Sequence, residues 1–279
     1  MGYRLICIDM DGTLLNSRKQ ISEKTKGSLL KAYQQGVHIV LTTGRTYVDA
    51  AYYAGLVGLR SPIIAVNGAY IQDQKSQQLI YQTTLNEKLA LRVLAICKEF
   101  RMKPNFHTPD KEYYGSMSLA MRWAYRFRNR TKVNRSPVKR KYVMSYRQWQ
   151  KVILKEQNTI AKCIIIDFNK KKLLKIRKEL SRITELEISS SGTNNIEINR
   201  QGTSKGKAVE ILAQHYHIPR EEIIAIGDGE NDLPMIEYAG LGVAMGNALD
   251  IVKEKADYIT ATNDLDGVAQ VIDKFVLNV

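Results

Sequence analysis

The two ends of the chain alternate between short apolar runs and stretches in which apolar residues recur at helical spacing. An apolar run over residues 3–8 is followed by an amphipathic stretch over residues 21–36 and by a second apolar run over residues 37–42. The expected strands are residues 3–8, 37–42, 62–66, 223–226, 241–245 and 258–259, and the expected helices are residues 21–36, 46–58, 205–216, 233–238, 249–255 and 265–276. Repeated strand–helix units of this kind predict an α/β fold with a doubly wound, mainly parallel Rossmann-like sheet.

The middle of the chain differs in both pattern and charge. After Asn67-Gly68-Ala69 we expect the chain to leave the sheet for an insertion. Residues 84–199 carry 26 Lys and Arg against 10 Asp and Glu, whereas the two flanking segments together carry 16 against 18. Helices are expected at residues 87–100, 145–154 and 173–180, and strands at residues 163–166 and 195–198. We therefore expect a discontinuous core domain of residues 1–82 and 200–279 and an inserted α+β domain of residues 83–199.

Composition narrows the class of protein. The 279 residues are 44% hydrophobic and 25% charged, which is typical of a globular protein, and no apolar run approaches the length of a membrane span. The cysteines Cys7, Cys97 and Cys163 are widely separated and lie in apolar stretches, so we expect buried reduced thiols. These features favour a cytoplasmic protein with no membrane partner, and they carry no signal for its oligomeric state.

Polar groups follow several of the expected strands at the point where each strand ends. Asp9 and Asp11 come directly after the first strand, and Asp228 follows the strand at residues 223–226. The carboxyl ends of parallel strands meet at one edge of a sheet, where open α/β folds bind ligands. Asp9, Asp11 and Asp228 are therefore expected to converge on an oxygen-lined site of the type that Mg²⁺ prefers.

Two further segments can bind an anion at the same edge. Thr43-Gly44-Arg45 closes the second strand with a hydroxyl and a backbone that can turn toward an anion. Residues 202–207 open a helix with free N–H groups and the ammonium group of Lys205, which favours phosphate. Lys205 could instead be a solvated lysine of the first turn, but a cation is unfavourable at that end of a helix, which favours a bound anion. Arg45 could instead pair with a nearby acid.

Four blocks in this order resemble the haloacid dehalogenase-like phosphohydrolases. They are Asp9-Met10-Asp11-Gly12-Thr13, Thr43-Gly44-Arg45, Lys205-Gly206 and Gly227-Asp228-Gly229-Glu230-Asn231-Asp232. More narrowly, the chain is similar to the Cof-type branch, which carries a large α+β cap after the third core strand. The resemblance implies that residues 83–199 are a cap that selects the substrate.

The resemblance also implies a role for each matching residue. Asp9 would attack phosphorus to form an aspartyl-phosphate, and Asp11 would protonate the leaving alkoxide and later deprotonate water. Mg²⁺ would be held by the side chains of Asp9 and Asp228 and the main-chain carbonyl of Asp11, with Asp232 in or near its shell. Phosphate would be bound by Thr43, Gly44, Lys205 and Asn231. The expected substrate is an anionic phosphorylated small molecule, such as a sugar phosphate or a phosphorylated cofactor.

Two other functions fit parts of the sequence. A phosphomutase or phosphotransferase would use Asp9 in the same way but transfer phosphate to a sugar hydroxyl. A nucleic-acid-binding module would use the basic-aromatic stretch at residues 123–130 and the basic segment 128–141, although neither contains a motif for binding DNA or RNA. A basic cap that attracts small anions accounts more simply for the charge. Candidate contacts to the leaving group are Tyr113, Tyr114, Trp123, Asn195 and Glu197, each of which could instead be a packing residue.

Overall fold

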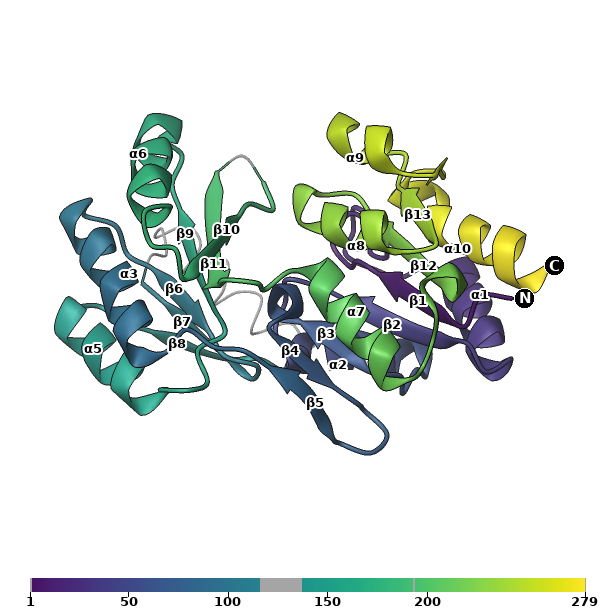
Figure 1. The fold of residues 1–279 in the computed structure, drawn as a ribbon, viewed down its shortest axis with the longest axis horizontal. Coiled ribbons are helices and arrows are strands. Elements are labelled where there is room, and N and C mark those ends of the chain that lie inside the picture. Colours follow the sequence, from purple (N-terminus) through teal and green to yellow (C-terminus); the bar gives the residue numbers. More distant parts are fainter. Residues whose placement is uncertain (1, 116–136, 193, 279) are drawn as a thin grey trace. The chain divides into compact units, whose positions relative to one another are not determined.

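The computed structural model describes residues 2–115, 137–192 and 194–278. Their contacts divide the chain into two compact units. The core unit consists of Met1–Thr83 and Gly202–Val279, and the inserted unit consists of Thr84–Gln201. Each unit has its own sheet and its own buried core, so each is described by itself (Figure 1).

The sheet of the core unit has eight described strands in the order β14-β13-β12-β1-β2-β3-β4-β5. The six strands from β14 to β3 run parallel, and β4 and β5 are antiparallel at one edge. The strands are β1 (Leu5–Ile8), β2 (His38–Thr42), β3 (Ile63–Ala65), β4 (Tyr70–Gln72), β5 (Leu79–Gln82), β12 (Ile223–Gly227), β13 (Leu241–Ala244) and β14 (Tyr258–Ile259). The mainly parallel sheet expected from the sequence is confirmed.

Helices cover this sheet because its central strands are apolar on both faces. Every residue of β1 is fully buried. Side chains of α7 and α8 pack on Leu5 and Cys7, while α1 contacts α10. The helices are α1 (Glu23–Gln34), α2 (Tyr47–Val57), α7 (Lys205–His215), α8 (Leu233–Tyr238), α9 (Asp250–Lys255) and α10 (Gly267–Ile272), with short helical turns at Val66–Gly68, Arg220–Glu222, Glu230–Asp232, Asn263–Leu265 and Asp273–Leu277.

The expectation that the chain leaves the sheet after Ala69 is wrong. The hairpin of β4 and β5 extends the core sheet before the inserted unit begins, and Thr83 still donates a backbone hydrogen bond to Ala69. These strands have no clean alternation of apolar and polar residues because they lie at an edge and are half-exposed. The helix expected at residues 265–276 is found as α10, which begins at Gly267 and continues after Ile272 as the π-helical turn Asp273–Leu277.

The inserted unit is an α+β structure with helices packed on one face of its sheet. Its six described strands are ordered β10-β11-β9-β6-β7-β8, and all neighbours are antiparallel except β7 and β8. The strands are β6 (Asn105–His107), β7 (Lys111–Tyr114), β8 (Lys139–Tyr142), β9 (Lys162–Ile166), β10 (Leu186–Ser189) and β11 (Asn195–Arg200), and the helices are α3 (Glu87–Glu99), α5 (Tyr146–Lys155) and α6 (Lys170–Leu180). The core of this unit contains Phe106 and Trp149, whose rings meet edge to face.

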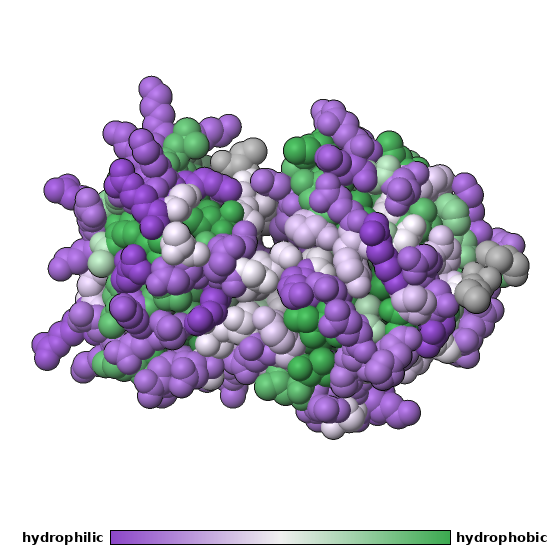
Figure 2. All heavy atoms as spheres, viewed as in Figure 1, coloured by the Kyte–Doolittle hydropathy of each residue, from purple (hydrophilic) through white to green (hydrophobic). Residues whose placement is uncertain are grey.

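Several expectations about the basic insertion fall on residues that the structure does not describe. The stretch 123–130 and most of segment 128–141 lie outside the described residues, and Lys139–Tyr142 of that segment forms β8. On the face drawn in Figure 2, hydrophilic side chains predominate and apolar side chains form small groups. None of the described helices combines the length and the apolar character needed to cross a bilayer. The three cysteines are free and buried, as expected.

Candidate active site

Three loops meet at the carboxyl edge of the core sheet. Strand β1 lies between β2 and β12, and the three strands run parallel, so the segments after them emerge side by side. Asp9 follows β1 directly, and its N–H donates to the carbonyl oxygen of Ile226 at 3.0 Å. This bond ties the loop after β1 to the end of β12. The sheet therefore brings together residues that are more than 200 positions apart in the sequence.

Lys205 lies at the centre of the site and is 1% exposed. Its Nζ is 2.6 Å from Oδ1 of Asp9 and 2.5 Å from Oδ1 of Asp232. Ser204 caps α7 by accepting a hydrogen bond from the N–H of Lys207, which fixes Lys205 in the first turn of the helix. Burial alone would lower the pKa of Lys205, but the charges of Asp232 and Asp9 and the hydrogen bonds to them outweigh it and raise that pKa above its usual range. The interpretation of Lys205 as a solvated lysine is wrong.

Asp232 orients the loop that follows β12. Its Oδ2 accepts hydrogen bonds from the N–H groups of Asp228 and Gly229 at 3.0 and 2.9 Å, while its Oδ1 faces Lys205. The start of α7 packs closely on the start of α8, which follows this loop: a Cβ atom at Gly206 would come within 2.2 Å of the Pro234 carbonyl oxygen. Glycine at this position therefore allows the close approach that places Lys205 on Asp232.

Asp228 lies against the glycine turn that follows β1. Its Oδ1 accepts a hydrogen bond from the hydroxyl of Thr13 at 3.0 Å. Gly12 has a φ of +89°, and a Cβ atom there would be 2.3 Å from Oδ2 of Asp228. Burial and, next, the charge of Asp232 raise the pKa of Asp228 to about 6. Gly12 thus keeps open the space that the Asp228 carboxylate occupies.

The carboxylates of Asp9, Asp228 and Asp232 form a cluster that could hold a metal ion. Each offers an oxygen within 4.8 Å of the others. Lys205 contacts two of these carboxylates, Asp9 and Asp232, so one ammonium group serves a cluster of three acids. Burial, opposed by Lys205 and reinforced by Asp232 and Asp228, raises the pKa of Asp9. A divalent cation would remove this repulsion between like charges.

Asp11 differs from the expectation that all three acids converge, because its side chain is not part of this cluster. Its carboxylate instead accepts hydrogen bonds from Arg45 at 2.6 and 2.7 Å and from Lys19 at 2.7 Å. Burial alone would raise the pKa of Asp11, but the bonds to Arg45 and then Lys19 outweigh it and hold that pKa far below its usual range. Arg45 is therefore the partner of an acid at the site.

The remaining predicted site residues lie in the segments that follow β2 and β12. Thr43 is 1% exposed, and its hydroxyl accepts a hydrogen bond from the N–H of Arg45 at 3.1 Å. Gly44 lies in the bend between β2 and α2, and Asn231 lies in the short helical turn that contains Asp232. Two further residues at the site were not expected from the sequence: Lys19 contacts Asp11, and Asp49 contacts Arg45. An Arg and an Asp four residues apart at the start of a helix was the signal available for Asp49.

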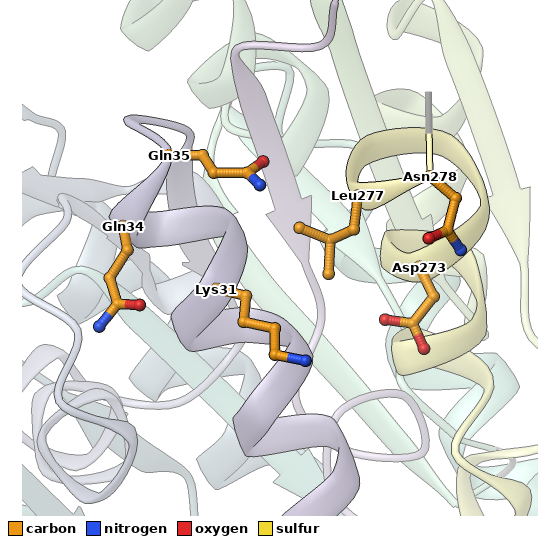
Figure 3. A pocket seen from close by; sticks show the side chains of 6 residues that line it. All are labelled: Lys31, Gln34, Gln35, Asp273, Leu277 and Asn278. Carbon is orange, nitrogen blue, oxygen red and sulfur yellow. The ribbon is translucent and has the colours of Figure 1, made fainter.

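A surface pocket of about 560 Å³ lies away from these residues, between α1 and the C-terminal turn (Figure 3). Its lining residues are Lys31, Gln34, Gln35, Asp273, Leu277 and Asn278. None of them is a predicted site residue. Asp273 is already engaged, since it accepts a hydrogen bond from the hydroxyl of Ser28 at 2.7 Å.

The inserted unit contains a separate group of buried charged residues. Lys162 and Glu197 are 1% and 4% exposed and form an ion pair of 3.0 Å. His107 is 7% exposed on the neighbouring strand β6, and burial lowers its pKa to about 4. Glu112 bonds to the hydroxyl of Tyr114 and to Arg140.

The candidate contacts to a leaving group have different surroundings. Tyr113 packs in the core of the inserted unit, and Glu197 is paired with Lys162. The hydroxyl of Tyr114 is bonded to Glu112, and the side chain of Asn195 bonds to Ser191. Trp123 lies outside the described residues.

Comparison with known proteins defines the family. The family model described as haloacid dehalogenase-like hydrolase matches residues 6–272. The chain therefore belongs to the haloacid dehalogenase-like hydrolases. A solved haloacid dehalogenase-like hydrolase from Bacillus subtilis has a TM-score of 0.85 and 31% identity, covering 98% of this chain and 100% of that one. A second, from Bacteroides thetaiotaomicron, has a TM-score of 0.81 and 30% identity, covering 98% and 99%.

Two curated relatives that match along nearly their full length are named phosphatases. A 5-amino-6-(5-phospho-D-ribitylamino)uracil phosphatase of Bacillus subtilis is 33% identical over 280 residues, covering 98% of this chain and 96% of the relative. A pyridoxal phosphate phosphatase of Escherichia coli is 26% identical over 276 residues, covering 98% of each. The family match and these relatives identify the chain as a phosphatase.

Proposed function

We propose that the protein is a Mg²⁺-dependent phosphatase that hydrolyses small-molecule phosphate monoesters through an aspartyl-phosphate on Asp9. The observation that carries this proposal is the buried group of Asp9, Asp228, Asp232 and Lys205 at the carboxyl edge of the sheet. It combines a nucleophilic carboxylate, an ammonium group and further oxygen ligands in one place. Phosphoryl transfer needs charge neutralisation and positioning of this kind.

The carboxylates fit a magnesium ion. Asp9 and Asp228 would hold it with their side chains and Asp11 with its main-chain carbonyl, and Asp232 would lie in or near the shell. When bound, Mg²⁺ supplies positive charge beside the phosphoryl oxygens. Both oxygens of Asp232 already accept hydrogen bonds from other groups, so its main part is to orient Lys205 and the loop that carries Asp228.

In the first half of the reaction a carboxylate oxygen of Asp9 attacks phosphorus. The bond between phosphorus and the ester oxygen breaks, and its electron pair stays with that oxygen. Asp11 supplies the proton that the leaving alkoxide needs. The ammonium of Lys205, which touches Asp9, is placed to bind the phosphoryl oxygens, with Thr43, Gly44 and Asn231 as further donors at the same edge.

In the second half water attacks the phosphorus of the aspartyl-phosphate. Asp11 takes a proton from this water, the bond to the Asp9 carboxylate breaks, and inorganic phosphate leaves. Splitting one displacement into two steps lowers the barrier of each. Both steps use the same pair of carboxyl groups two residues apart.

The substrate class is proposed from the relatives and from the domain organisation. We assign catalysis to the core unit and substrate selection to the inserted unit, with residues 83–199 as the cap. The named substrates of the two curated relatives are phosphate esters of small molecules that carry a heterocycle. Such esters, together with sugar phosphates, are the substrates we propose, acted on in the cytoplasm.

The test is a phosphate-release screen with and without Mg²⁺. The panel contains the two relatives' substrates, flavin mononucleotide and several sugar phosphates, and it compares the native chain with Asp9→Asn and with Asp250→Asn as the matched control on an exposed position. We expect Mg²⁺-dependent release by the native chain and the control, and a loss of ~10³-fold or more in Asp9→Asn. Full activity of Asp9→Asn would exclude Asp9 as the nucleophile. An isomerised phosphate ester without release of inorganic phosphate would instead indicate a phosphomutase.

A further inference from the structure

The three helices that cover the sheet of the inserted unit form one layer with a large excess of basic residues. Helix α3 contacts both α5 and α6, and all three lie on the same side of the sheet (Figure 1). Basic residues outnumber acidic ones by three to two in α3, by three to none in α5 and by six to one in α6. Much of the positive charge of the chain is therefore concentrated in this helical layer.

The basic side chains of the layer lie on its outer surface. Each helix buries an apolar stripe against the sheet, with Val93 in α3, Ile153 in α5 and Ile176 in α6 fully buried. Helical periodicity then turns the remaining positions toward solvent, and Lys151, Lys171 and Lys175 are all exposed. The described ion pairs that involve this layer and its flanking residues leave these three lysines unpaired; they are Arg92–Glu185, Lys172–Asp167 and Arg182–Glu179.

Apolar side chains are exposed among these lysines. Leu154 of α5 is 51% exposed and lies between Lys151 and Lys155, and Leu174 of α6 is 66% exposed and lies beside Lys175. Phe168, just before α6, is 88% exposed, and Met144, just before α5, is exposed as well. A single exposed apolar residue is ordinary, but the combination of lysines with protruding Leu and Phe is typical of helices that lie on a membrane surface.

An anionic bilayer offers a partner to both kinds of side chain. Its headgroups attract the lysines, and the boundary between headgroups and acyl chains can take up the exposed leucines. The phosphate backbone of DNA or RNA would attract the lysines in the same way, but it offers no apolar partner to Leu154 and Leu174. Nine of the twelve basic residues in the three helices are lysines, which lack the planar fork with which arginine recognises phosphates and bases.

We propose that the outer surface of α3, α5 and α6 binds the surface of a membrane that contains anionic phospholipids. This inference does not depend on the proposed phosphatase function, because none of these helices carries a residue of the candidate active site. It differs from the expectation of no membrane partner, which rested on the lack of a long apolar run in the sequence. Binding to a membrane surface requires a basic surface with a few apolar side chains rather than such a run.

The experiment measures sedimentation of the full chain with lipid vesicles. One set of vesicles is phosphatidylcholine alone, and the other is an equal mixture of phosphatidylcholine and phosphatidylglycerol. We expect binding to the mixed vesicles and little binding to phosphatidylcholine. Binding should weaken as salt is raised from ~0.1 M to ~1 M, because the screening length falls from about 10 Å to about 3 Å.

The first variant tests the charges of the layer. The combined change Lys151→Glu, Lys171→Glu and Lys175→Glu keeps good helix-forming residues at these positions. Each basic residue near an anionic surface strengthens binding about 5-fold, so we expect affinity for the mixed vesicles to fall at least ~10²-fold. The matched control reverses three exposed charges of the core unit with the same change in net charge, and it should bind like the native chain; its changes are Lys24→Glu, Arg60→Glu and Lys75→Glu.

The second variant tests the apolar side chains. Leu154→Gln with Leu174→Gln keeps the net charge and removes two exposed leucines. Affinity for the mixed vesicles should fall on the order of 10-fold, since less apolar surface leaves water on binding. Affinity for single-stranded poly(U) RNA should be the same in this variant and in the native chain, because leucine adds nothing to contacts with phosphate.

Several results would overturn the proposal. They are equal binding to neutral and anionic vesicles, a control that loses as much affinity as the lysine variant, and native affinity of the leucine variant for the mixed vesicles. Tighter binding to poly(U) than to the mixed vesicles would indicate a nucleic-acid surface instead. Circular dichroism establishes that each variant is folded, and Lys171→Glu with Lys175→Glu carries the comparison if the triple variant is not. Phosphate release is not measured here, so failure of the proposed function and failure of this inference are distinguishable.

Discussion

Replacing Lys205 with methionine removes the ammonium group that lies between Asp9 and Asp232 while keeping a side chain of similar length. Both carboxylates are at most 5% exposed, so solvent cannot take over the role of the lysine. Removing one partner of a buried ion pair costs about 3–5 kcal/mol of stability. Lys207 lies two positions after Lys205 on the same helix, and its contact with Glu210 is exposed, so Lys207→Met should leave the free energy of unfolding nearly unchanged.

The assay is urea unfolding at neutral pH in the presence of a chelator, followed by far-UV circular dichroism. Far-UV circular dichroism follows the helices of both units, whereas both tryptophans, Trp123 and Trp149, fall in the sequence of the inserted unit. We expect a clearly lower midpoint for Lys205→Met than for Lys207→Met or the native chain. Because three carboxylates then lack a cation, Mg²⁺ should restore more stability in Lys205→Met than it adds to the native chain.

The size of the magnesium effect can also be stated. A ligand at a hundred times its Kd adds about 2.7 kcal/mol to the folded state. Equal midpoints for Lys205→Met and Lys207→Met in the chelator would refute the reasoning, since the buried carboxylates would then not depend on the ammonium group. A magnesium effect that is the same in all three proteins would contradict the placement of the metal beside Asp9.

Three further predictions concern single positions. Gly12→Ala should weaken activation by Mg²⁺ at least ~10-fold, because Gly12 has a positive φ and the new Cβ would displace the carboxylate of Asp228. A magnesium titration of the rate that is unchanged in the variant would contradict this prediction. Lys162→Met should lower the tryptophan-monitored stability of the inserted unit by about 3–5 kcal/mol, and adding Glu197→Leu should restore most of it. Burial lowers the pKa of His107 to about 4 from the 6.5 of an unfolded chain, so stability should fall by up to ~3 kcal/mol as pH drops from 6.5 to 4. His107→Phe should flatten this dependence, and an unchanged slope of urea midpoint against pH would contradict the assignment.

The central parallel strands could be predicted because strands that are buried on both faces consist almost entirely of apolar residues. Strands β1 and β12 are buried on both faces and read as continuous apolar runs. Helices α3 and α5 carry capping residues, Asn86 and Ser145, before apolar residues at helical spacing. In these strands and helices the local sequence pattern matches the burial of the side chains in the folded protein.

Two of the strands that the hydrophobic pattern did not predict, β6 and β7, bury polar side chains. In β6 and β7, Asn105, His107 and Glu112 are all at most 8% exposed, so an apolar pattern cannot mark them as buried. Their burial depends on partners such as Arg140, on a strand 28 residues away in the sequence. A rule based on hydrophobic periodicity cannot anticipate such contacts.

The sequence was sufficient to predict which loops meet at the site. It was not sufficient to predict the orientation of each side chain. The topology of parallel strands brings Asp9 and Asp228 to one edge, and the helix start brings Lys205 to them. The orientation of Asp11 is set by Lys19 and Arg45, which come from two other segments. Rotamers fixed by long-range ion pairs leave no local signal in the sequence.

The central claim is that Asp9 carries the phosphoryl group during turnover. The most direct measurement stops the reaction during steady turnover in Mg²⁺ by denaturation, reduces acyl phosphates with borohydride, and analyses the peptides by mass spectrometry. The account predicts that Asp9, and no other carboxyl residue, is converted to homoserine, and that no conversion occurs without substrate. Phosphate release at full rate with Asp9 unmodified, or with the phosphoryl group found on another residue, would contradict it.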